Sequence, residues 1–488
     1  MNHLQADWLA DAPLFAAWRE FVHSGPTPFT IPGHKRRAAL LNTDLGRLLD
    51  ADVPLYGGAD TVKLTAGVLA DAQKRAAALW GADVCRFSTG GSTHANEVLC
   101  LAVLRPGDTV LVGRNAHRSV LGGLVLAGAR PVWLQVDIDE ASGAPLGVSP
   151  DTVIAALAQH PQAAAVMVTD PSYQGAISDL AGVVAAAHDR DVPVLVDQAW
   201  GAHLGFGPGI PPHALALGAD AMITSAHKML PAFSQAAIVL AQGPRIDVDR
   251  LDRAFDATHT TSPSAAILAS IDAARALLAN PVGSKLLSEL VQTVEAARVE
   301  LRSVGLSVPG PHDHPPGRHD PAKLVIGFAA AGQSGLTAEA ELLARGIPVE
   351  MADRDTIVAQ VGLVDDRATI GRLVAGIAAS VAEPAGPPRP VVATTVTTPL
   401  QILTPRQAFF ADYECVALAD AVGGVSAELI APYPPGVPLL IPGERIDRET
   451  LTALDRVIES GTRVAYAADP DLRTVHVVID PGAPTDRV

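Results

Sequence analysis

Short apolar runs rich in β-branched residues recur along the chain between about residues 80 and 240. The runs VCRF, TVLVG, RPVWLQV, AAAVMVTD, VPVLVD and AMITS are separated by stretches rich in Ala and Leu that are long enough to form helices. This alternation predicts βαβ units, in which a mostly parallel sheet carries helices on both faces. Ligands of such sheets bind at the carboxyl ends of the strands. We therefore expect the polar segments VTDPSY, LVDQAWGAH and ITSAHK, each of which follows an apolar run, to converge on one crevice.

The pattern changes after this region. Helices rich in Ala and Leu extend from residue 266 to about 305, and mixed strands and helices follow. A Pro-rich, nearly uncharged stretch is typical of a linker. Beyond it we expect a helix around DYECVALADAVG, a second helix around RETLTALDRVIESG and a terminal strand. The predicted organisation comprises an N-terminal segment (1–45), a large domain (46–265), a small α+β domain (266–382), a linker (383–399) and a C-terminal α+β domain (400–488).

Composition and charge narrow the class of protein. Hydrophobic residues make up 48% of the chain and charged residues 18%, which is typical of a globular protein with a large core. The formal charge of −16 disfavours nucleic acid and anionic membranes as partners and mildly favours a cationic substrate. The start of the chain has no basic segment followed by an apolar one, and no apolar run reaches the roughly 18 residues of a membrane span. We expect a cytoplasmic protein. Its three cysteines suggest neither a disulfide framework nor a metal site.

The strongest chemical signal is a lysine and an aspartate that each follow an apolar strand. Lys228 ends the sequence SAHK, and Asp197 ends VPVLVD. Partial desolvation at a strand end lowers the pKa of a lysine and makes it a good imine-forming nucleophile. Taken alone, Lys228 is more often a surface residue, and an aspartate such as Asp197 is common in any α/β fold. Together they supply what a pyridoxal cofactor requires, which is an amine and a carboxylate that keeps the ring nitrogen protonated.

A glycine-rich turn and two histidines are further candidates. The turn STGGSTHAN follows VCRF and precedes a predicted helix, so its amides and hydroxyls could hold a phosphate, although an ordinary β-to-α turn would have the same composition. His117 follows TVLVG, where an imidazole could stack on a pyridine ring or simply occupy a polar turn. His203, in WGAH, could line the same crevice or bind a loop carbonyl.

The order of these motifs resembles a known family. TPFTIPGHKR, GGSTHAN, GRNAHRSV, DPSYQGAISDL, VDQAWGAHLGF, SAHKMLPAFSQ and HTTSPSAAILASID together resemble the Orn/Lys/Arg decarboxylases of the short, bacterial arginine-decarboxylase type. The stretch from LTPRQAFFADYE to IPGERI is similar to that family's C-terminal domain. The resemblance runs from about residue 25 to 450. It implies an α/β fold of the aspartate-aminotransferase type, pyridoxal 5′-phosphate as cofactor, and decarboxylation of arginine, lysine or ornithine.

The resemblance also implies a role for each matching residue. Lys228 would hold the cofactor as a Schiff base, Asp197 would contact the ring nitrogen and His117 would stack on the ring. The remaining cofactor contacts would be Ser92, Thr93, Ser225 and His227 around the phosphate, Ala199 and Trp200 against the ring, and Thr261 and Ser262 reaching the neighbouring subunit's phosphate. The site would therefore lie at the interface of a homodimer or a larger homo-oligomer. Residues 58–65, GADTVKLT, replace the family's Leu-Asp-Asp-Leu-His-like stretch near the entrance.

Substrate and reaction leave alternatives open. Glu428, before a Pro-rich segment, could pair with the distal cation of the substrate or be a solvated glutamate at a helix end. Lys228 or His227 would return a proton to Cα after carbon dioxide leaves. An aminotransferase or an aldolase-type lyase on the same fold is the alternative, although an aminotransferase typically clamps the substrate carboxylate with an arginine that the sequence does not reveal. A catalytically silent relative is disfavoured because Lys228 and Asp197 are both present.

Overall fold

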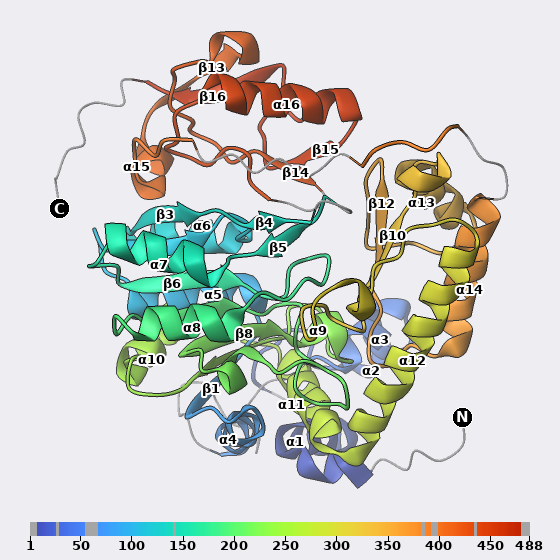
Figure 1. Ribbon diagram of the computed structural model, residues 1–488. Coiled ribbons are helices and arrows are strands. Elements are labelled where there is room, and N and C mark those ends of the chain that lie inside the picture. Colours follow the sequence, from blue (N-terminus) through green and yellow to red (C-terminus); the bar gives the residue numbers. More distant parts are fainter. Residues whose placement is uncertain are drawn as a thin grey trace.

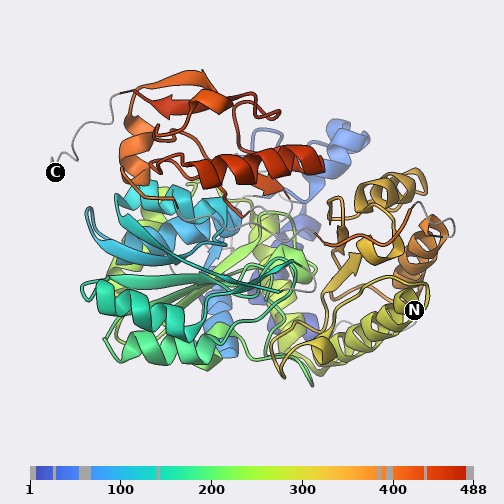
Figure 2. The same cartoon turned by 45° about the horizontal axis from the view of Figure 1, so that its top comes forward.

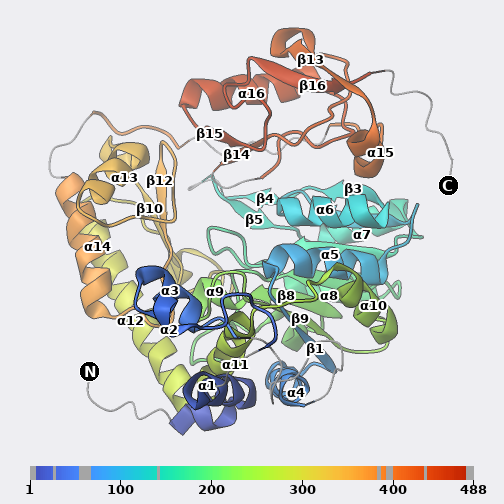
Figure 3. The ribbon, with the colours of Figure 1, turned by 180° about the vertical axis from the view of Figure 1, so that it is seen from behind.

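The computed structural model describes residues 7–25, 29–53, 67–139, 143–381, 386–391, 399–433 and 437–479. Figure 1 shows three parts: a large part around a central sheet, a smaller part that contains α12, α13 and α14, and a C-terminal part that lies over β3 and α6. The view from behind shows the same arrangement, with the N-terminal helices α1 (Pro13–Ser24), α2 (Ala38–Leu41) and α3 (Asp44–Asp50) on the near side (Figure 3).

The central sheet has seven strands. In spatial order they are β1 (Val84–Ser88), β9 (Ala237–Ala241), β8 (Ala221–Ser225), β7 (Val194–Asp197), β6 (Ala165–Thr169), β2 (Thr109–Gly113) and β3 (Arg130–Leu134). The pairs from β8 to β3 are parallel, whereas β9 is antiparallel to both of its neighbours. The six strands predicted from the sequence and the mostly parallel sheet are thus confirmed. The seventh strand, β9, was not predicted, because a short apolar run such as AAIVLA cannot be told from a buried helical segment by pattern alone.

Both faces of the sheet are buried, and alternate side chains of each strand serve opposite cores. In β7, Leu195 belongs to one apolar cluster, whereas Val194 and Val196 belong to the other. Figure 2 shows the strands between two layers of helices. One cluster contains α5 (Gly91–Val103), α6 (Arg118–Ala127) and α10 (Val248–Thr258); the other contains α4 (Val68–Trp80), α7 (Pro150–Gln159), α8 (Leu180–His188) and α11 (Ala265–Ala279).

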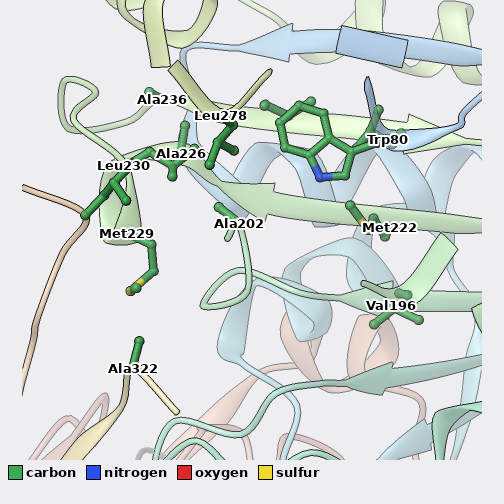
Figure 4. Packing of buried hydrophobic residues seen from close by; sticks show 14 of the residues in the cluster. Trp80, Val196, Ala202, Met222, Ala226, Met229, Leu230, Ala236, Leu278 and Ala322 are labelled. Atoms are coloured by element: carbon green, nitrogen blue, oxygen red, sulfur yellow. The ribbon is translucent and has the colours of Figure 1, made fainter. Parts of the chain in front are cut away.

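The larger core also anchors the segment that carries Lys228. Trp80 is fully buried and packs edge-on against Phe206, with ring centroids 5.1 Å apart. Figure 4 shows Trp80 in the same cluster as Ala226 and Met229. These last two residues bound the short helix α9 (Ala226–Met229), which begins where β8 ends. Since both are buried, the backbone on either side of Lys228 is fixed by packing.

The smaller part has its own antiparallel sheet, in the order β10 (Leu324–Gly327), β12 (Thr356–Ala359), β11 (Met351–Ala352). Its helices are α12 (Pro281–Ser303), α13 (Gly335–Ala344) and α14 (Arg367–Ser380). The helices predicted between residues 266 and 305 are confirmed as α11 and α12. Within the described ranges no single helix is long and apolar enough to cross a membrane, and only the pair α11 and α12, bent by 81°, passes on length and composition.

The C-terminal part corrects one prediction. The helix expected around DYECVALADAVG is wrong, because Tyr413–Ala417 form strand β13, antiparallel to β16 (Thr474–Val478). The helix of this region lies earlier, at α15 (Pro405–Phe410). Pairing with a distant strand overrides local helix preference here, and the Tyr413 ring stacks on His476 across the ladder. The predicted helix α16 (Arg448–Ser460) and the terminal strand β16 are confirmed, and a small ribbon of β14 (Ala431–Tyr433) and β15 (Arg463–Ala465) completes the part.

A buried ion pair ties the C-terminal part to the central sheet. Arg114, directly after β2, donates to both carboxylate oxygens of Glu444 at 2.5 and 3.0 Å, and both side chains are inaccessible to solvent. Arg114 also donates to the carbonyl of Leu439, and Glu444 accepts from the amide of Ile441. This bidentate pair fixes the segment that begins at Val437 against the end of β2.

We predict that Glu444→Gln destabilises the protein by about 3–5 kcal/mol, because it leaves the Arg114 guanidinium buried without its counter-charge. The matched control is Arg463→Gln, which breaks an exposed pair with Glu339 that also links the C-terminal part to the smaller part. An exposed pair of this kind contributes about 0–1 kcal/mol. Thermal unfolding measures the stability of both variants. Equal losses of stability would contradict the conclusion that the buried pair ties the C-terminal part to the sheet.

Candidate active site

A cavity of about 440 Å³ opens at the carboxyl ends of the parallel strands. Its wall includes Thr169, Asp197 and Ser225, the last residues of β6, β7 and β8. The segments VTDPSY, LVDQAWGAH and ITSAHK all contribute to it, as predicted from their position after apolar runs. Nine of the residues singled out in the sequence line this cavity: Ser92, Thr93, His117, Asp197, Ala199, Trp200, Ser225, His227 and Lys228.

One end of the cavity is lined by the start of helix α5. Gly91 has a positive φ of 69°, and its amide donates to the carbonyl of Gln235. A Cβ atom at Gly90 would lie 2.7 Å from Cβ of His94, so a side chain there would clash. The hydroxyls of Ser92 and Ser225 meet at 2.6 Å. A helix start with amides, hydroxyls and closely approaching glycine backbone has the chemistry of a phosphate site.

Lys228 extends into the middle of the cavity. Its Nζ lies 4.0 Å from the centroid of the Trp200 ring. Burial lowers the pKa of Lys228, an effect that the carboxylates of Asp197 and Glu350 oppose. Its backbone carbonyl accepts a hydrogen bond from Gln360 of the smaller part, at 2.5 Å. The backbone of Lys228 is thus held by the smaller part of the chain, and the amine is closer to its neutral, nucleophilic form than that of a surface lysine.

Asp197 and His117 also line the cavity. The Asp197 carboxylate accepts from the amide of Ala199 at 3.1 Å and from the side chain of Asn96 at 2.7 Å. Nδ1 of His117 lies 2.8 Å from the hydroxyl of Ser119, and the ring itself is exposed to the cavity. His227 lies near the α5 end, and its Nδ1 donates to the carbonyl of Ala236. Burial lowers the pKa of His227.

A carboxylate that the sequence did not indicate is hydrogen-bonded to the cavity wall. Tyr173 lines the cavity, and its hydroxyl donates to Glu350 at 2.9 Å. Tyr433, from the C-terminal part, packs against the same small apolar cluster as Tyr173. Burial, together with the negative charge of Glu350, raises the pKa of Tyr173, so its hydroxyl stays a donor. Glu350 lies just before β11, and no local motif in the sequence links it to Lys228.

A second lysine, Lys323, lies close to the Trp200 ring. Lys323 Nζ is 3.9 Å from the Trp200 ring centroid and 5.1 Å from that of Tyr173, and it has no hydrogen-bond partner among the described residues. Only 4% of the residue is exposed, and burial lowers its pKa to about 8. His203 was expected either to line the cavity or to bind a loop carbonyl. Neither interpretation is correct, because its ring is fully buried and pairs with Asp320 at 2.9 Å.

Three predicted site residues lie outside the cavity. The carboxylate of Glu428 accepts from the amides of Ala468 and His476, both at 2.6 Å, so it is committed within the C-terminal part. Thr261 and Ser262 are exposed between α10 and α11. Their predicted contact with a neighbouring subunit stays a prediction. The atypical segment 58–65 lies outside the described residues.

Solved structures with a similar fold place the molecule in a class. The E. coli constitutive lysine decarboxylase has a TM-score of 0.80 at 23% identity, covering 97% of this chain and 83% of that chain. A serine palmitoyltransferase structure with PLP has a TM-score of 0.54 at 16% identity, covering 76% of this chain and 84% of that chain. The protein therefore has the fold of the fold-type I pyridoxal-phosphate-dependent enzymes.

Sequence comparison gives the family. Residues 12–308 match the Orn/Lys/Arg decarboxylase major domain, and residues 392–461 match the C-terminal domain of the same family. The chain is 33% identical to an arginine decarboxylase of Halalkalibacterium halodurans over 96% of this chain and 97% of the relative. It is 32% identical to an arginine decarboxylase of Bacillus subtilis over 96% of this chain and 98% of the relative. The chain belongs to the Orn/Lys/Arg decarboxylase family, as its motifs predict.

We predict that Lys323→Met stabilises the protein at pH 7. Because the pKa of Lys323 falls from 10.5 to about 8 on folding, the unfolded chain binds more protons than the folded one between these values. The free energy of unfolding therefore rises with pH between these two values. Below about pH 8 it is lowered by the full cost of burying the charge. The gain from Lys323→Met, on the order of a few kcal/mol at pH 7, should shrink as the pH rises above 8.

Melting temperatures of wild type and variant between pH 7 and 10 test this dependence. Lys285→Met on α12, where the side chain is 70% exposed, is the matched control and should show no such trend. A difference between wild type and Lys323→Met that stays constant with pH would contradict the prediction.

Proposed function

We propose that the protein is a pyridoxal-5′-phosphate-dependent decarboxylase of a basic L-amino acid, with arginine as the preferred candidate. The observation that carries the proposal is the placement of Lys228 and Asp197 at the ends of neighbouring strands β8 and β7, in one cavity with the start of α5. The arginine decarboxylases that align along nearly the whole chain support arginine over lysine.

The residues present fit the proposed cofactor. Gly90 and Gly91 at the start of α5, together with the paired hydroxyls of Ser92 and Ser225, make one end of the cavity suited to a phosphate. Thr93 and His227 would complete that end, and Ala199 and Trp200 would pack against the ring. When bound, pyridoxal phosphate supplies an electron sink for the bond that breaks at Cα.

This chain's own side chains would then divide the remaining tasks. Lys228 would hold the cofactor and, once freed by the substrate amine, return a proton to Cα. Asp197 would keep the ring nitrogen protonated through a carboxylate whose two oxygens are already oriented by protein donors. His117 would cover one face of the ring. His227 is the second candidate for the proton transfer, because it lines the same cavity.

The cavity wall favours decarboxylation over aminotransfer. An aminotransferase typically clamps the substrate carboxylate with a bidentate arginine. Among the described residues that line the cavity there is no arginine. A carboxylate left unclamped can turn perpendicular to the ring, the orientation that breaking its bond to Cα requires. An aminotransferase or aldolase-type lyase is therefore the weaker alternative.

We propose Glu350, and no longer Glu428, as the residue that binds the distal cation of the substrate. The oxygens of Glu428 are occupied by backbone amides away from the cavity, whereas Glu350 lies beside Tyr173 of the cavity wall, whose hydroxyl donates to one of its oxygens. An exposed carboxylate with one oriented oxygen can accept a guanidinium or an ammonium. Because the Tyr173 hydroxyl occupies only part of its capacity, Glu350 can still accept further hydrogen bonds.

We further propose that the protein acts as a cytoplasmic homodimer or larger homo-oligomer. In that arrangement Thr261 and Ser262, which are exposed on the isolated chain, would reach the phosphate end of the neighbouring subunit's cavity. Neither nucleic acid nor membrane is proposed as a partner, in keeping with the net charge of −16.

The first prediction tests the reaction. Purified protein should show the absorbance band of lysine-bound pyridoxal phosphate and release carbon dioxide with agmatine, cadaverine or putrescine from arginine, lysine or ornithine. Lys228→Ala should lose both the band and the activity, because no other amine lines the cavity within the described residues. A bound cofactor without carbon dioxide from any of the three substrates would favour the alternative reactions, and absence of cofactor binding would overturn the proposal.

The second prediction tests the substrate contact. Glu350→Gln should raise KM for arginine about tenfold or more, since a charge-assisted hydrogen bond is worth roughly 1.5–3 kcal/mol. The cofactor should still bind, because Glu350 is not among the residues that line the cavity. Glu341→Gln is the matched control, an exposed glutamate on α13 that pairs only with Arg345 among the described residues. An unaltered KM in Glu350→Gln would return the search for the distal contact to other residues.

A further inference from the structure

A chain of hydrogen bonds behind the cavity wall joins Asp197 to His117. The side-chain nitrogen of Asn96 lies 2.7 Å from Oδ2 of Asp197 and 2.9 Å from Oγ of Ser119. Oγ of Ser119 in turn lies 2.8 Å from Nδ1 of His117. Asn96 is fully buried, and Asp197 and Ser119 are each 2% exposed. Asn96 does not line the cavity, so it acts on the site only through these neighbours.

The chemistry of the partners fixes the direction of every bond in this chain. An ionised carboxylate only accepts, so the Asn96 amide must turn its NH₂ group, and not its oxygen, toward Asp197. The second hydrogen of that group goes to Oγ of Ser119, which leaves the Ser119 hydroxyl hydrogen to donate to Nδ1 of His117. The backbone amide of Ser119 also points at Nδ1, at 3.3 Å. Nδ1 is therefore an acceptor, and the ring proton of His117 is on Nε2.

The side-chain amide of Asn96 is only partly satisfied by hydrogen bonds. That oxygen is buried and has no hydrogen-bond partner among the described residues. Leaving a buried carbonyl oxygen unpaired costs about 1–3 kcal/mol. An apolar side chain would avoid this cost, so the stability of the core alone does not favour asparagine at position 96.

Close packing of two helices makes the contact possible. Ser119 lies in the first turn of α6, and Asn96 lies in the second turn of α5. One turn further along α6, a Cβ atom at Gly123 would lie 2.6 Å from Sγ of Cys100 and 3.3 Å from the backbone oxygen of Asn96. Only glycine allows the helices to approach this closely, and that approach brings Ser119 within reach of Asn96.

We propose that Asn96 is a positioning residue that sets two groups at once: the orientation of the Asp197 carboxylate and the Nε2–H tautomer of His117. The inference rests on the proposed function, because these are the groups that would contact the edge and the face of the cofactor ring. Asn96 and the amide of Ala199 each bind one oxygen of Asp197, so the carboxylate cannot rotate away from the ring nitrogen. The donated hydrogen at Nδ1 keeps the imidazole neutral.

A neutral imidazole suits a position over a protonated ring. A second positive charge there would compete with the ring nitrogen for Asp197 and disfavour its protonation. Desolvation by the surrounding protein lowers the pKa of His117, in the same direction as the hydrogen bond from Ser119. Lys228 and Arg118 act in that direction too, whereas Asp197 opposes it. Geometry and charge thus favour the same tautomer.

Three variants test the proposal. Asn96→Leu removes both hydrogen bonds from a side chain of similar size. Ser119→Ala interrupts only the branch to His117, and Ser119→Thr keeps the hydroxyl and serves as the conservative control. The first readout is the ring-nitrogen NMR spectrum of histidine-labelled protein without cofactor, with the His117 signals identified by their loss in His117→Gln. The second is the dissociation constant for pyridoxal phosphate, and melting temperatures check that each variant is folded.

We expect His117 to be in the Nε2–H form in wild type and in Ser119→Thr. It should become a mixture of tautomers in Ser119→Ala, where only the longer contact from the backbone amide remains, and in Asn96→Leu, where the Ser119 hydroxyl is no longer oriented. Asn96→Leu should weaken cofactor binding about tenfold or more, and Ser119→Ala should weaken it less, because its Asp197 contact remains. A wholly Nε2–H ring in Ser119→Ala, or cofactor binding within twofold of wild type in folded Asn96→Leu, would overturn the proposal. Failure of wild type to bind cofactor would instead overturn the proposed function, and the tautomer readout does not depend on it.

Discussion

Burial of the central sheet on both faces is the constraint from which the site follows. In β7, for example, Val194, Leu195 and Val196 alternate between two apolar cores, so no polar side chain is accommodated along the strand. Polar groups can gather only where the strands end. Parallel strands place several such ends side by side, and Asp197 and Ser225 are the last residues of two of them. The cavity is thus a consequence of how the sheet is covered.

Because the cavity is cut into an apolar core, each charge near it requires a defined partner. Asp197 accepts hydrogen bonds from Asn96 and Ala199, and Arg114 forms an ion pair with Glu444. Lys323 differs, since its ammonium lies near two aromatic rings and makes no hydrogen bond among the described residues. Its charge lies on the same indole as Lys228, where like charges favour the neutral form of an amine. The destabilising lysine and the proposed nucleophile are therefore parts of one electrostatic arrangement.

The sequence predicted the sheet and the cavity wall well because both depend on local patterns. An apolar run followed by a polar residue identifies a strand end, and this rule located Asp197, Ser225 and Lys228 without knowledge of the fold. It failed where a contact joins distant segments. The strand β13 forms only because β16 pairs with it some sixty residues later, and Glu350 approaches Tyr173 only after the smaller part has folded onto the sheet. Glu428 was attractive for its neighbouring prolines, yet its oxygens are used by backbone amides that no sequence pattern reveals.

Asn96 shows a further limit of the same kind. It stands in the motif GGSTHAN, four residues after Ser92, and the motif drew attention to the phosphate end alone. On a helix this spacing places the two side chains on one face, one turn apart. The face that presents Ser92 to the proposed phosphate therefore also presents Asn96 to Asp197, deeper along the same helix. A single helix would thus serve both ends of the proposed cofactor, so a shift of α5 would alter phosphate binding and ring protonation together. The close packing of α5 against α6 at Gly123, where there is no room for a side chain, would limit such a shift.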